Sequence, residues 1–429
     1  TPRQIHVQMI AEVFAHLRAL KPGPARIYIA GCSGEPVALA EALRSEPELA
    51  RDLTFVGVPV PGLNRTDWTS LHETARAEMP FLYGDMRAAF DAGKIRLRPM
   101  HYSDSYRDMV NGPIDLAVVM VSPAEADGRV SLGVSADFSG AVLARTDIPA
   151  MAIVNRNMPA PADTPRVPLS RFAVVVEDDT PLVELTESAL PPTFAQIGET
   201  IAGLVGTDAA CLQFGIGNVQ QAALKALSEA GGPANLRIHS GLVTNPVLGL
   251  IDAGRVVDEA GAILTGVAMG TQALYERVAR DHRFRFRAVD VTHGIDVLAE
   301  IDRFVAINSV LEVDLFGQAN AEFMKGRQVS GIGGLANFLR GAAASEGGMP
   351  IVALPSTAAR GQVSRIVARL GPEAVSLPRS DISWVVTEHG AVDLRGTDID
   401  RRAESLISIA DPAHRDDLMA AWAGMRRGL

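Results

Sequence analysis

Short runs of hydrophobic residues alternate with segments of helical spacing along the whole chain. In the first half the runs are LTFVGVPVPGL, IRLRPM and DLAVVMV, and helical segments stand between them. Runs of this length that are rich in β-branched residues are typical of buried strands, and strands that alternate with helices form mostly parallel sheets. The pattern therefore predicts an α/β protein.

A strand, a glycine turn and a helix open each half of the chain in the same order. RIYIAGCSGEPVALAEAL predicts a strand at Arg26–Ala30 and a helix from near Pro36, and CLQFGIGNVQQAALKAL at 211–227 repeats the arrangement. When the two segments are aligned, Gly31 falls on Gly215. We interpret this match as an internal duplication, and chance similarity between two strand–helix units is the alternative.

The stretch Phe304–Gly341 carries the clearest candidate binding element. FVAINSVLEVDLFG predicts strand structure, and Gly331–Gly334 come directly before LANFLRGA, which has the spacing of a helix. A glycine turn that opens a helix leaves backbone N–H groups directed outward, where a phosphate, a carboxylate or a developing oxyanion can bind. An ordinary tight turn that needs positive φ is the alternative. The spacing matches neither a dinucleotide-binding fingerprint nor a Walker loop.

Length and charge narrow the classes of protein. The chain has 429 residues, 47% of them hydrophobic and 21% charged, which suits two globular domains of roughly 150–250 residues each. A net charge of −10 without a stripe of basic residues argues against binding to nucleic acid. We find no apolar run of about 18 residues, no cleavable signal pattern, and two cysteines without metal-binding spacing. These features predict a cytoplasmic protein.

Composition also suggests where the domains meet. Residues 156–182 are rich in proline, as expected for a connecting segment. We therefore predict an N-terminal domain at 1–165, a linker at 166–189 and a C-terminal domain at 190–429.

Four long motifs identify a family resemblance. AINSVLEVDLFGQANAE, QVSGIGGLANFLRGAAASEGGMPIVALPSTA, GQVSRIV and WVVTEHGAVDLRG follow in order, and the resemblance is densest from Ala306 to Gly396. The chain resembles the acetyl-CoA hydrolase/transferase family and is similar to its 4-hydroxybutyrate, acetate/succinate and itaconate CoA-transferases. The resemblance implies two related open α/β domains of the CoA-transferase (NagB-like) fold with the active cleft between them. It also implies a homodimer or higher homo-oligomer that uses acyl-CoA and a carboxylic acid as substrates, with no permanently bound cofactor and no metal.

The resemblance also implies a ping-pong mechanism. A glutamate carboxylate attacks the acyl-CoA thioester to give an anhydride, the released thiolate attacks the glutamyl carbonyl, and the enzyme then holds CoA as a thioester. A second carboxylic acid reverses these steps. The chemistry requires a carboxylate nucleophile, donors for an oxyanion and a site that excludes water.

The sequence departs from the family at the nucleophile. The family's glutamate lies in a segment of the form H-S/T-E, whereas this chain has His239, Ser240 and Gly241 there, which we assign to substrate binding. Glu35, in GCSGEP, is our candidate for the catalytic carboxylate, because the start of the helix at Pro36 favours an ionised acid. The alternative is that Glu35 only complements the helix dipole.

The remaining predicted site residues are contacts for CoA. They occupy two glycine turns and one basic position: Gly215, Ile216, Gly217, Asn218, Val219, Gly331, Ile332, Gly333, Gly334 and Arg360. Gly333 and Gly334 are also expected to act in catalysis by supplying backbone donors near the thioester. Arg360 is expected to bind phosphate in place of the family's lysine, since position 359 is alanine. A solvated surface arginine is the alternative.

Three functions follow from this comparison of motifs. The first is a CoA-transferase that moves CoA from succinyl-CoA or acetyl-CoA to a small acid such as itaconate or 4-hydroxybutyrate. GVPVPGLNRTDW and HSGLV favour the itaconate-type branch. The second is an acyl-CoA thioester hydrolase, and the third is a CoA-binding protein without turnover, because Gly241 removes the usual nucleophile.

Overall fold

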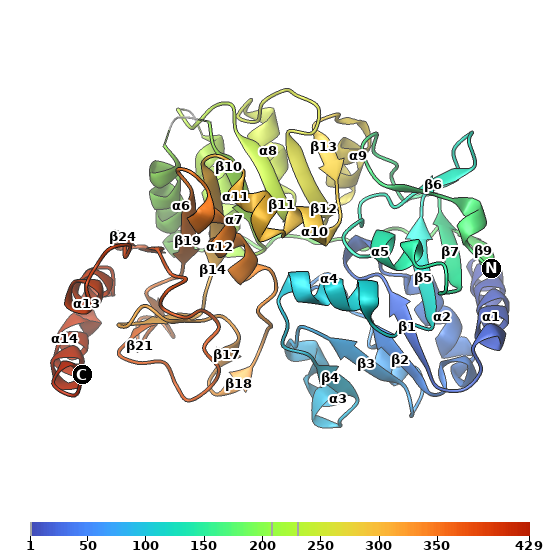
Figure 1. Cartoon of the computed structure of the whole chain (residues 1–429), viewed down its shortest axis with the longest axis horizontal. Helices are drawn as coiled ribbons and strands as arrows, with labels where there is room; N and C mark the ends of the chain where they lie inside the picture. The colour runs from blue at the N-terminus through green and yellow to red at the C-terminus, as the bar shows by residue number, and fades with distance from the viewer. Residues whose placement is uncertain (1, 207–208, 230) are drawn as a thin grey trace. The chain divides into compact units, whose positions relative to one another are not determined.

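The chain folds into two compact units, each built around a sheet (Figure 1). The computed structural model describes residues 2–206, 209–229 and 231–429. The first unit comprises residues 1–186 and 259–292, and the second comprises 187–258 and 293–429. Within the described residues, no helix is long and apolar enough to cross a membrane.

The first unit contains a sheet in which every neighbouring pair of strands is parallel. The strands lie in the order β4-β3-β2-β1-β5-β7-β9. Their bounds are β1 (Ala25–Ile29), β2 (Leu53–Val56), β3 (Arg76–Met79), β4 (Ile95–Leu97), β5 (Leu116–Val121), β7 (Ala150–Asn155) and β9 (Val174–Asp178). Every residue of β5 is buried, which explains its unbroken apolar sequence LAVVMV.

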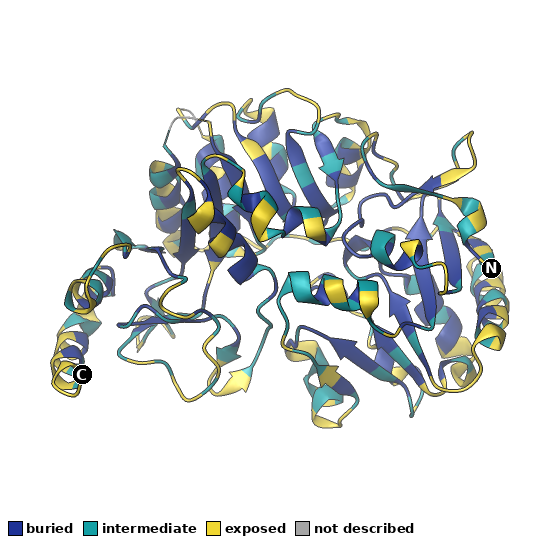
Figure 2. Cartoon of the chain, viewed as in Figure 1, coloured by how far each residue is buried: buried dark blue, intermediate teal, exposed yellow. Residues whose placement is uncertain are grey.

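The longer helices of this unit have buried residues on one side and exposed residues on the other, as Figure 2 shows. The long helix α1 (Pro2–Leu20) packs against β7, β9 and α2 (Val37–Ser45), and it buries Ile10, Phe14 and Leu17 at helical spacing. The unit's other elements are α3 (Arg87–Asp91), α4 (Tyr102–Asn111), α5 (Ser139–Ala144), α9 (Gln272–Arg280), α10 (Val289–Thr292), β6 (Arg129–Ser131), β8 (Arg166–Pro168), β12 (Ile263–Ala268) and β13 (Phe284–Phe286).

The second unit has strands in the order β11-β10-β14-β19-β23-β24. Their bounds are β10 (Cys211–Phe214), β11 (Arg237–Val243), β14 (Phe304–Ser309), β19 (Met349–Ala353), β23 (Trp384–Thr387) and β24 (Gly390–Asp393). The pairs are parallel except β23 with β24, which form an antiparallel edge.

Two helices of the second unit pack on its central strand. Both α7 (Asn218–Ser228) and α12 (Leu335–Ala344) contact β14, and α12 buries Leu335, Phe338 and Leu339 as its sequence spacing predicts. The other helices are α6 (Pro192–Val205), α8 (Pro246–Asp252), α11 (Ile295–Ala299), α13 (Ile399–Ser408) and α14 (Arg415–Arg426). The short strands are β15 (Glu312–Asp314), β16 (Ala319–Asn320), β17 (Phe323–Met324), β18 (Arg327–Gln328), β20 (Thr357–Ala358), β21 (Val363–Ser364) and β22 (Ile366–Val367).

The opening strands occupy equivalent positions in the two units. In the first unit β1 lies between β2 and β5, and in the second β10 lies between β11 and β14, with all four pairings parallel. A helix follows each opening strand after a short turn. The prediction of two related α/β units is confirmed, and this shared topology supports the interpretation of the sequence match as a duplication.

The structure divides the chain differently from the predicted boundaries. The segment predicted as a linker, 166–189, contains β8 and β9, and β9 pairs with β7 along its whole length. Its apolar residues therefore belong to the first sheet despite the prolines around them. In addition, residues 259–292 belong to the first unit, although they follow the start of the second in sequence.

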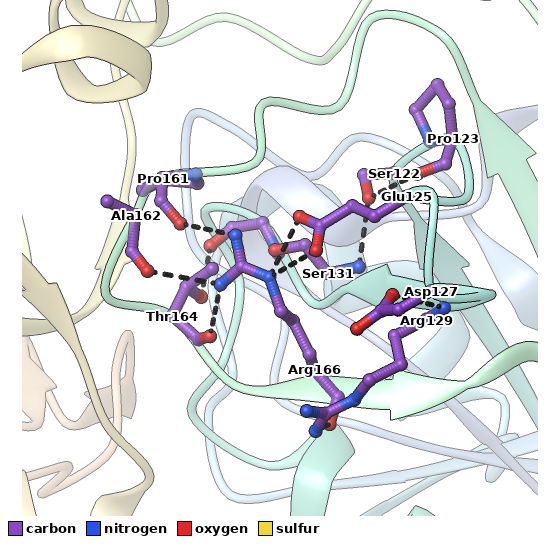
Figure 3. A network of polar contacts seen from close by, with 11 residues as sticks. Ser122, Pro123, Glu125, Asp127, Arg129, Ser131, Pro161, Ala162, Thr164 and Arg166 are labelled. Atoms are coloured by element: carbon purple, nitrogen blue, oxygen red, sulfur yellow. Dashed lines mark hydrogen bonds and ion pairs between the residues drawn. The ribbon is translucent and has the colours of Figure 1, made fainter.

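One arginine connects the loops beside β6 and β8 through hydrogen bonds (Figure 3). Arg166 Nε donates to both carboxylate oxygens of Glu125, at 2.8 and 2.9 Å. Its other nitrogens donate to the carbonyl oxygens of Pro161, Ala162 and Thr164. A guanidinium suits this task because it offers five donors in a fixed plane.

Candidate active site

The glycine-rich segments of the second unit gather at the carboxyl edge of its parallel strands. Ser240 Oγ donates to the carbonyl oxygen of Phe214 at 2.8 Å, so the middle of β11 lies beside the end of β10. Gly241 directly follows Ser240, and Gly215 directly follows Phe214, so both glycines lie at the same edge. Ligands of open α/β sheets bind at this edge. Ser240 itself is fully buried and links two strands.

The first glycine turn opens helix α7. Gly217 has φ +119° and precedes Asn218, the first helical residue, so this position favours glycine. The side chain of Gln220 folds back over the turn, with Nε2 3.2 Å from the place of a Cβ on Gly215. Gln220 is buried, and its Oε1 has no hydrogen-bond partner among the described residues. The turn therefore combines helix N–H donors with an acceptor still to be satisfied.

The second glycine turn opens helix α12. Gly333 is buried with φ +55°, Gly334 caps the helix, and Leu335 N donates to the carbonyl oxygen of Ile332 at 3.3 Å. The prediction of a glycine turn that leads into a helix is confirmed here. The positive φ at Gly333 favours glycine at this position even without a bound ligand.

A histidine lies against both Gly241 and Gly334. A Cβ at position 241 would be 2.5 Å from Cε1 and 2.9 Å from Nε2 of His293, and one at 334 would be 2.6 Å from Cδ2 and from Nε2. The ring also packs on Phe338, with centroids 4.5 Å apart. The imidazole therefore fills the space where side chains at 241 and 334 would otherwise lie.

Burial determines the charge of this histidine. His293 is 4% exposed, and removal from water, with a smaller contribution from His239, lowers its pKa to about 3. It is therefore neutral at physiological pH. His239 is also buried and contacts Phe304 edge-on at 6.2 Å between centroids.

Two residues of this site, His293 and Gln220, are absent from the sequence predictions. His293 follows α10 in VTHGID, far in sequence from both glycines that it contacts. The only local signal for Gln220 is its position in the first turn of a helix after a glycine turn. Gly241 drew attention as a departure from a family motif, but what lies beside it depends on tertiary packing.

Glu35 lies in the first unit, in a setting that differs from the expectation. Asn64 Nδ2 donates to its carboxylate at 3.0 Å, and burial raises its pKa while hydrogen bonds from Asn64, Thr66 and Trp68 act in the opposite sense. An acid kept ionised by the helix start was expected, and the direction is the reverse because desolvation outweighs these donors. Glu35 lines a cavity of about 30 Å³, which is room for about one water molecule. Its role as nucleophile stays a prediction.

Arg360 lies at the tip of the β20–β21 hairpin. Ala359, Arg360 and Gly361 have φ values of +50°, +57° and +87°, an unfavourable run for the first two residues. Arg360 is exposed and forms no ion pair within the described part of the chain. The hairpin exposes the guanidinium group of Arg360 to solvent. This position is compatible with phosphate binding or with a solvated side chain.

One group of metal-ligand residues occurs in the first unit. His6, Asp178 and Asp179 place ligand atoms within 4.8 Å of one another. His6 Nδ1 lies 3.5 Å from Asp179 Oδ1, and Asp178 Oδ2 is buried without a hydrogen-bond partner among the described residues.

Comparisons with known proteins agree on one family. Models of the acetyl-CoA hydrolase/transferase N-terminal and C-terminal domains match residues 9–187 and 270–422. The chain is 34% identical over 402 residues to 4-hydroxybutyrate coenzyme A transferase from Clostridium kluyveri, covering 92% of each. The crystal structure of RipA from Yersinia pestis has a TM-score of 0.87 at 29% identity, covering 98% of this chain and 99% of that one. A 4-hydroxybutyrate CoA-transferase from Porphyromonas gingivalis has a TM-score of 0.77 at 29% identity, covering 98% and 97%.

Proposed function

Because the chain belongs to the acetyl-CoA hydrolase/transferase family and is an enzyme of the CoA-transferase type, we propose that it moves CoA from succinyl-CoA or acetyl-CoA to a small carboxylic acid. Itaconate and 4-hydroxybutyrate are the acceptors to test first. The observation that carries this proposal is the similarity to a 4-hydroxybutyrate CoA-transferase over 92% of both chains. A similarity of that extent covers both units and leaves no large segment unmatched.

The glycine turns supply the proposed binding groups for CoA. The N-termini of α7 and α12 direct N–H donors toward the carboxyl edge of the second sheet, where a thioester carbonyl or a phosphate can accept them. Gly215–Val219 and Gly331–Gly334 form these turns, and Arg360 is the proposed phosphate partner. The unpaired Oε1 of Gln220 suits an amide N–H of the pantetheine arm.

Substrate binding is proposed for the segment that ends β11. His239 and Ser240 are buried and Gly241 is half-buried, so of the three Gly241 borders the accessible edge. The His293 ring occupies the side-chain space at this position, so the proposed contact with an acyl group or an acceptor acid is through the Gly241 backbone. His239 and Ser240 would act by fixing the backbone around it.

A ping-pong route through a glutamyl-CoA thioester requires an ionised carboxylate. Glu35 is the sequence candidate for that nucleophile, and burial that raises its pKa works against it. If Glu35 does react, Glu35→Gln abolishes transfer and the CoA adduct maps to residues 33–44. A Glu35→Gln variant with full turnover would exclude Glu35 as the nucleophile.

The activity is tested by incubating the protein with acetyl-CoA or succinyl-CoA, alone and with a panel of carboxylic acids. New acyl-CoA that forms only with an acceptor supports a transferase. Free thiol that appears without any acceptor indicates a hydrolase, the alternative that Gly241 favours because water would replace the missing carboxylate. Absence of both products, with CoA still bound, indicates a binding protein.

Assembly is a separate proposal. We propose a homodimer or a higher homo-oligomer, as the family resemblance implies, and light scattering of the purified protein measures it. A mass equal to one chain at micromolar concentration would contradict it.

A further inference from the structure

A histidine and two carboxylates of the first unit meet where helix α1 packs against the end of strand β9. His6 is on α1, Asp178 is the last residue of β9, and Asp179 follows it. Ligand atoms of the three side chains all lie within 4.8 Å of one another. We propose that they bind a divalent transition-metal ion such as Zn²⁺, which joins α1 to the sheet. This site is independent of the proposed transferase function, and it departs from the family resemblance, which implies no metal.

The strongest indication of a ligand is an unsatisfied oxygen on Asp178. The residue is only 4% exposed, and its Oδ2 is buried without a hydrogen-bond partner among the described residues. Its Oδ1, by contrast, accepts from Thr180 N at 3.2 Å and from Thr180 Oγ1 at 2.9 Å. A buried carboxylate oxygen without a donor costs free energy. A bound cation would satisfy that oxygen, while the two bonds to Oδ1 hold the carboxylate in place.

The separation of His6 and Asp179 also suits a shared ion. Nδ1 lies 3.5 Å from Oδ1, which is beyond the usual length of about 2.7–3.2 Å for a hydrogen bond. Two ligand atoms bound tetrahedrally at about 2.0–2.2 Å from an ion lie roughly 3.3–3.6 Å apart. The two side chains are 30% and 50% exposed, so they can close on an ion that enters from solvent.

Side chains of a neighbouring segment hold the backbone that carries the two acids. Asn155, the last residue of β7, donates from Nδ2 to the carbonyl oxygen of Thr180 at 2.8 Å. Asn157 donates from Nδ2 to the carbonyl oxygen of Asp179 at 2.7 Å. The turn after β9 is therefore positioned before any ion binds, which lowers the cost of ordering its ligands.

The alternation of buried and exposed residues directs the ligands toward each other. On β9, Val176 and Asp178 are buried, whereas Glu177 between them is exposed. Val176 belongs to the same core cluster as Ile10 of α1, and His6 stands one helical turn before Ile10 on the same face. His6 and Asp178 therefore extend, by one position each, the two faces that pack together in this core.

Arg3 is a cation on the same helix that competes for the two acids. Its guanidinium pairs with Glu41, and no hydrogen bond or ion pair joins it to Asp178 in the described part of the chain. Glu41 raises the pKa of this arginine most, and Asp178 and Asp179 raise it further. The two acids therefore attract positive charge, but this arginine is bound to another carboxylate.

The set of donor atoms indicates the class of ion. An imidazole nitrogen suits Zn²⁺ and other transition-metal ions, whereas Mg²⁺ and Ca²⁺ prefer oxygen ligands alone. Two carboxylates balance the charge of a divalent ion, and three protein ligands leave a position for water. Because an ion held here connects α1 to β9, its binding free energy adds to the stability of the first unit.

The first experiment measures binding of Zn²⁺. The full chain is treated with a chelator, dialysed and titrated with zinc chloride in a calorimeter. We expect wild-type protein to bind one ion that Asp178→Asn binds at least about tenfold more weakly, as when a metal site loses a carboxylate. Glu177→Gln is the matched control, since it removes one charge from the opposite face of the same strand, and it should bind as wild type does. Equal binding by wild type and Asp178→Asn, or no binding by wild type, would overturn the proposal.

The second experiment measures thermal melting with and without Zn²⁺, and it uses His6→Ala because that side chain is partly exposed and its loss leaves the core intact. Above the dissociation constant, each tenfold increase in free Zn²⁺ should raise the Tm of wild type by about 3–6 °C. We expect the same rise in Glu177→Gln and little or none in His6→Ala. A rise in His6→Ala equal to that in wild type would exclude His6 as a ligand and overturn the site. Neither experiment depends on transfer of CoA, so the proposed function stands or fails separately.

Discussion

The two strand–turn–helix units share a scaffold but differ in what surrounds the turn. In the first unit, a Cβ on Gly31 would lie 2.0 Å from the carbonyl oxygen of Val58. Asn64 closes the same turn from the side, accepting from Cys32 N and donating to Cys32 O, both at 2.9 Å. The protein's own atoms therefore satisfy the polar groups of this turn.

In the second unit the equivalent turn is open. The nearest atom to a Cβ on Gly215 is Gln220 Nε2, at 3.2 Å and on a flexible side chain. Gly215 is half-buried and Gly217 is exposed, whereas residues 32–36 after Gly31 are buried. A repeated local motif therefore does not imply a repeated role, because packing from distant residues decides whether the turn can bind a ligand.

The largest expected effect comes from filling the closed turn. Gly31→Ala places a methyl group against the backbone of Val58, which cannot move aside as a side chain can. We expect the free energy of unfolding of the first unit to fall by about 3 kcal/mol, the upper part of the usual range for overpacking. Gly215→Ala, the matched change in the open turn, should cost less than about 0.5 kcal/mol. Urea unfolding measures both, and equal losses would refute the contrast.

The second prediction concerns the buried acid beside the closed turn. Asp137 accepts from Tyr102 Oη at 3.0 Å, and burial raises its pKa to about 6 from 3.8. Because the folded pKa is raised, the stability that it contributes is present below pH 4 and is lost as pH rises through 6. Asp137→Asn should therefore become more stable relative to wild type, by about 2 kcal/mol, between pH 4 and 7.5.

Urea unfolding across this pH range provides the measurement. Asp85→Asn, a change at an exposed carboxylate of the same unit, is the control and should show little difference from wild type. A constant difference between Asp137→Asn and wild type at all pH values would mean that folding does not raise the pKa of Asp137.

The third prediction tests whether position 241 and the His293 ring compete for the same space. Gly241→Glu must displace the His293 ring, and we expect it to cost about 2 kcal/mol of stability. In the double variant Gly241→Glu/His293→Ala, the loss should be smaller than the sum of the single losses by about 1 kcal/mol. Strict additivity in a double-mutant cycle would show that the two positions do not compete for space.

The smallest expected effect is on ligand affinity at the second glycine turn. Gly333→Val puts a β-branched residue at φ +55° and blocks close approach of a ligand to the backbone. We expect the affinity for CoA to fall by about tenfold, or roughly 1.4 kcal/mol. Gly396→Val, at φ +69° with open space around it, is the control for backbone strain alone. Calorimetric titration with CoA compares them, and equal affinities would make the loop purely structural.

Much of the fold could be predicted from local patterns. Apolar runs such as LAVVMV became buried strands, and the spacing of Leu335, Phe338 and Leu339 gave the buried face of α12. These predictions succeed because burial and secondary structure impose the periodicity directly on the sequence. Both glycine turns of the second unit could also be predicted locally, because their glycines stand directly before segments with helical spacing.

The features that escaped prediction depend on contacts between distant segments. Nothing near VTHGID indicates that His293 will contact one glycine of β11 and another directly before α12. The sign of the pKa shift at Glu35 depends on burial, which the local helix-dipole argument does not include. Likewise, the prolines before β9 suggested a linker, and only its pairing with β7 shows a strand.

The return of residues 259–292 to the first unit has a consequence for synthesis of the chain. A ribosome releases residues 1–186 first, then all of 187–258, before the segment that completes the first unit leaves the exit tunnel. Domains generally fold as units during translation. The first unit therefore cannot complete its folding while residues 187–258 of the second unit are synthesised. A nascent chain stalled near residue 258 should therefore be more sensitive to protease within its first 186 residues than one stalled well beyond residue 292.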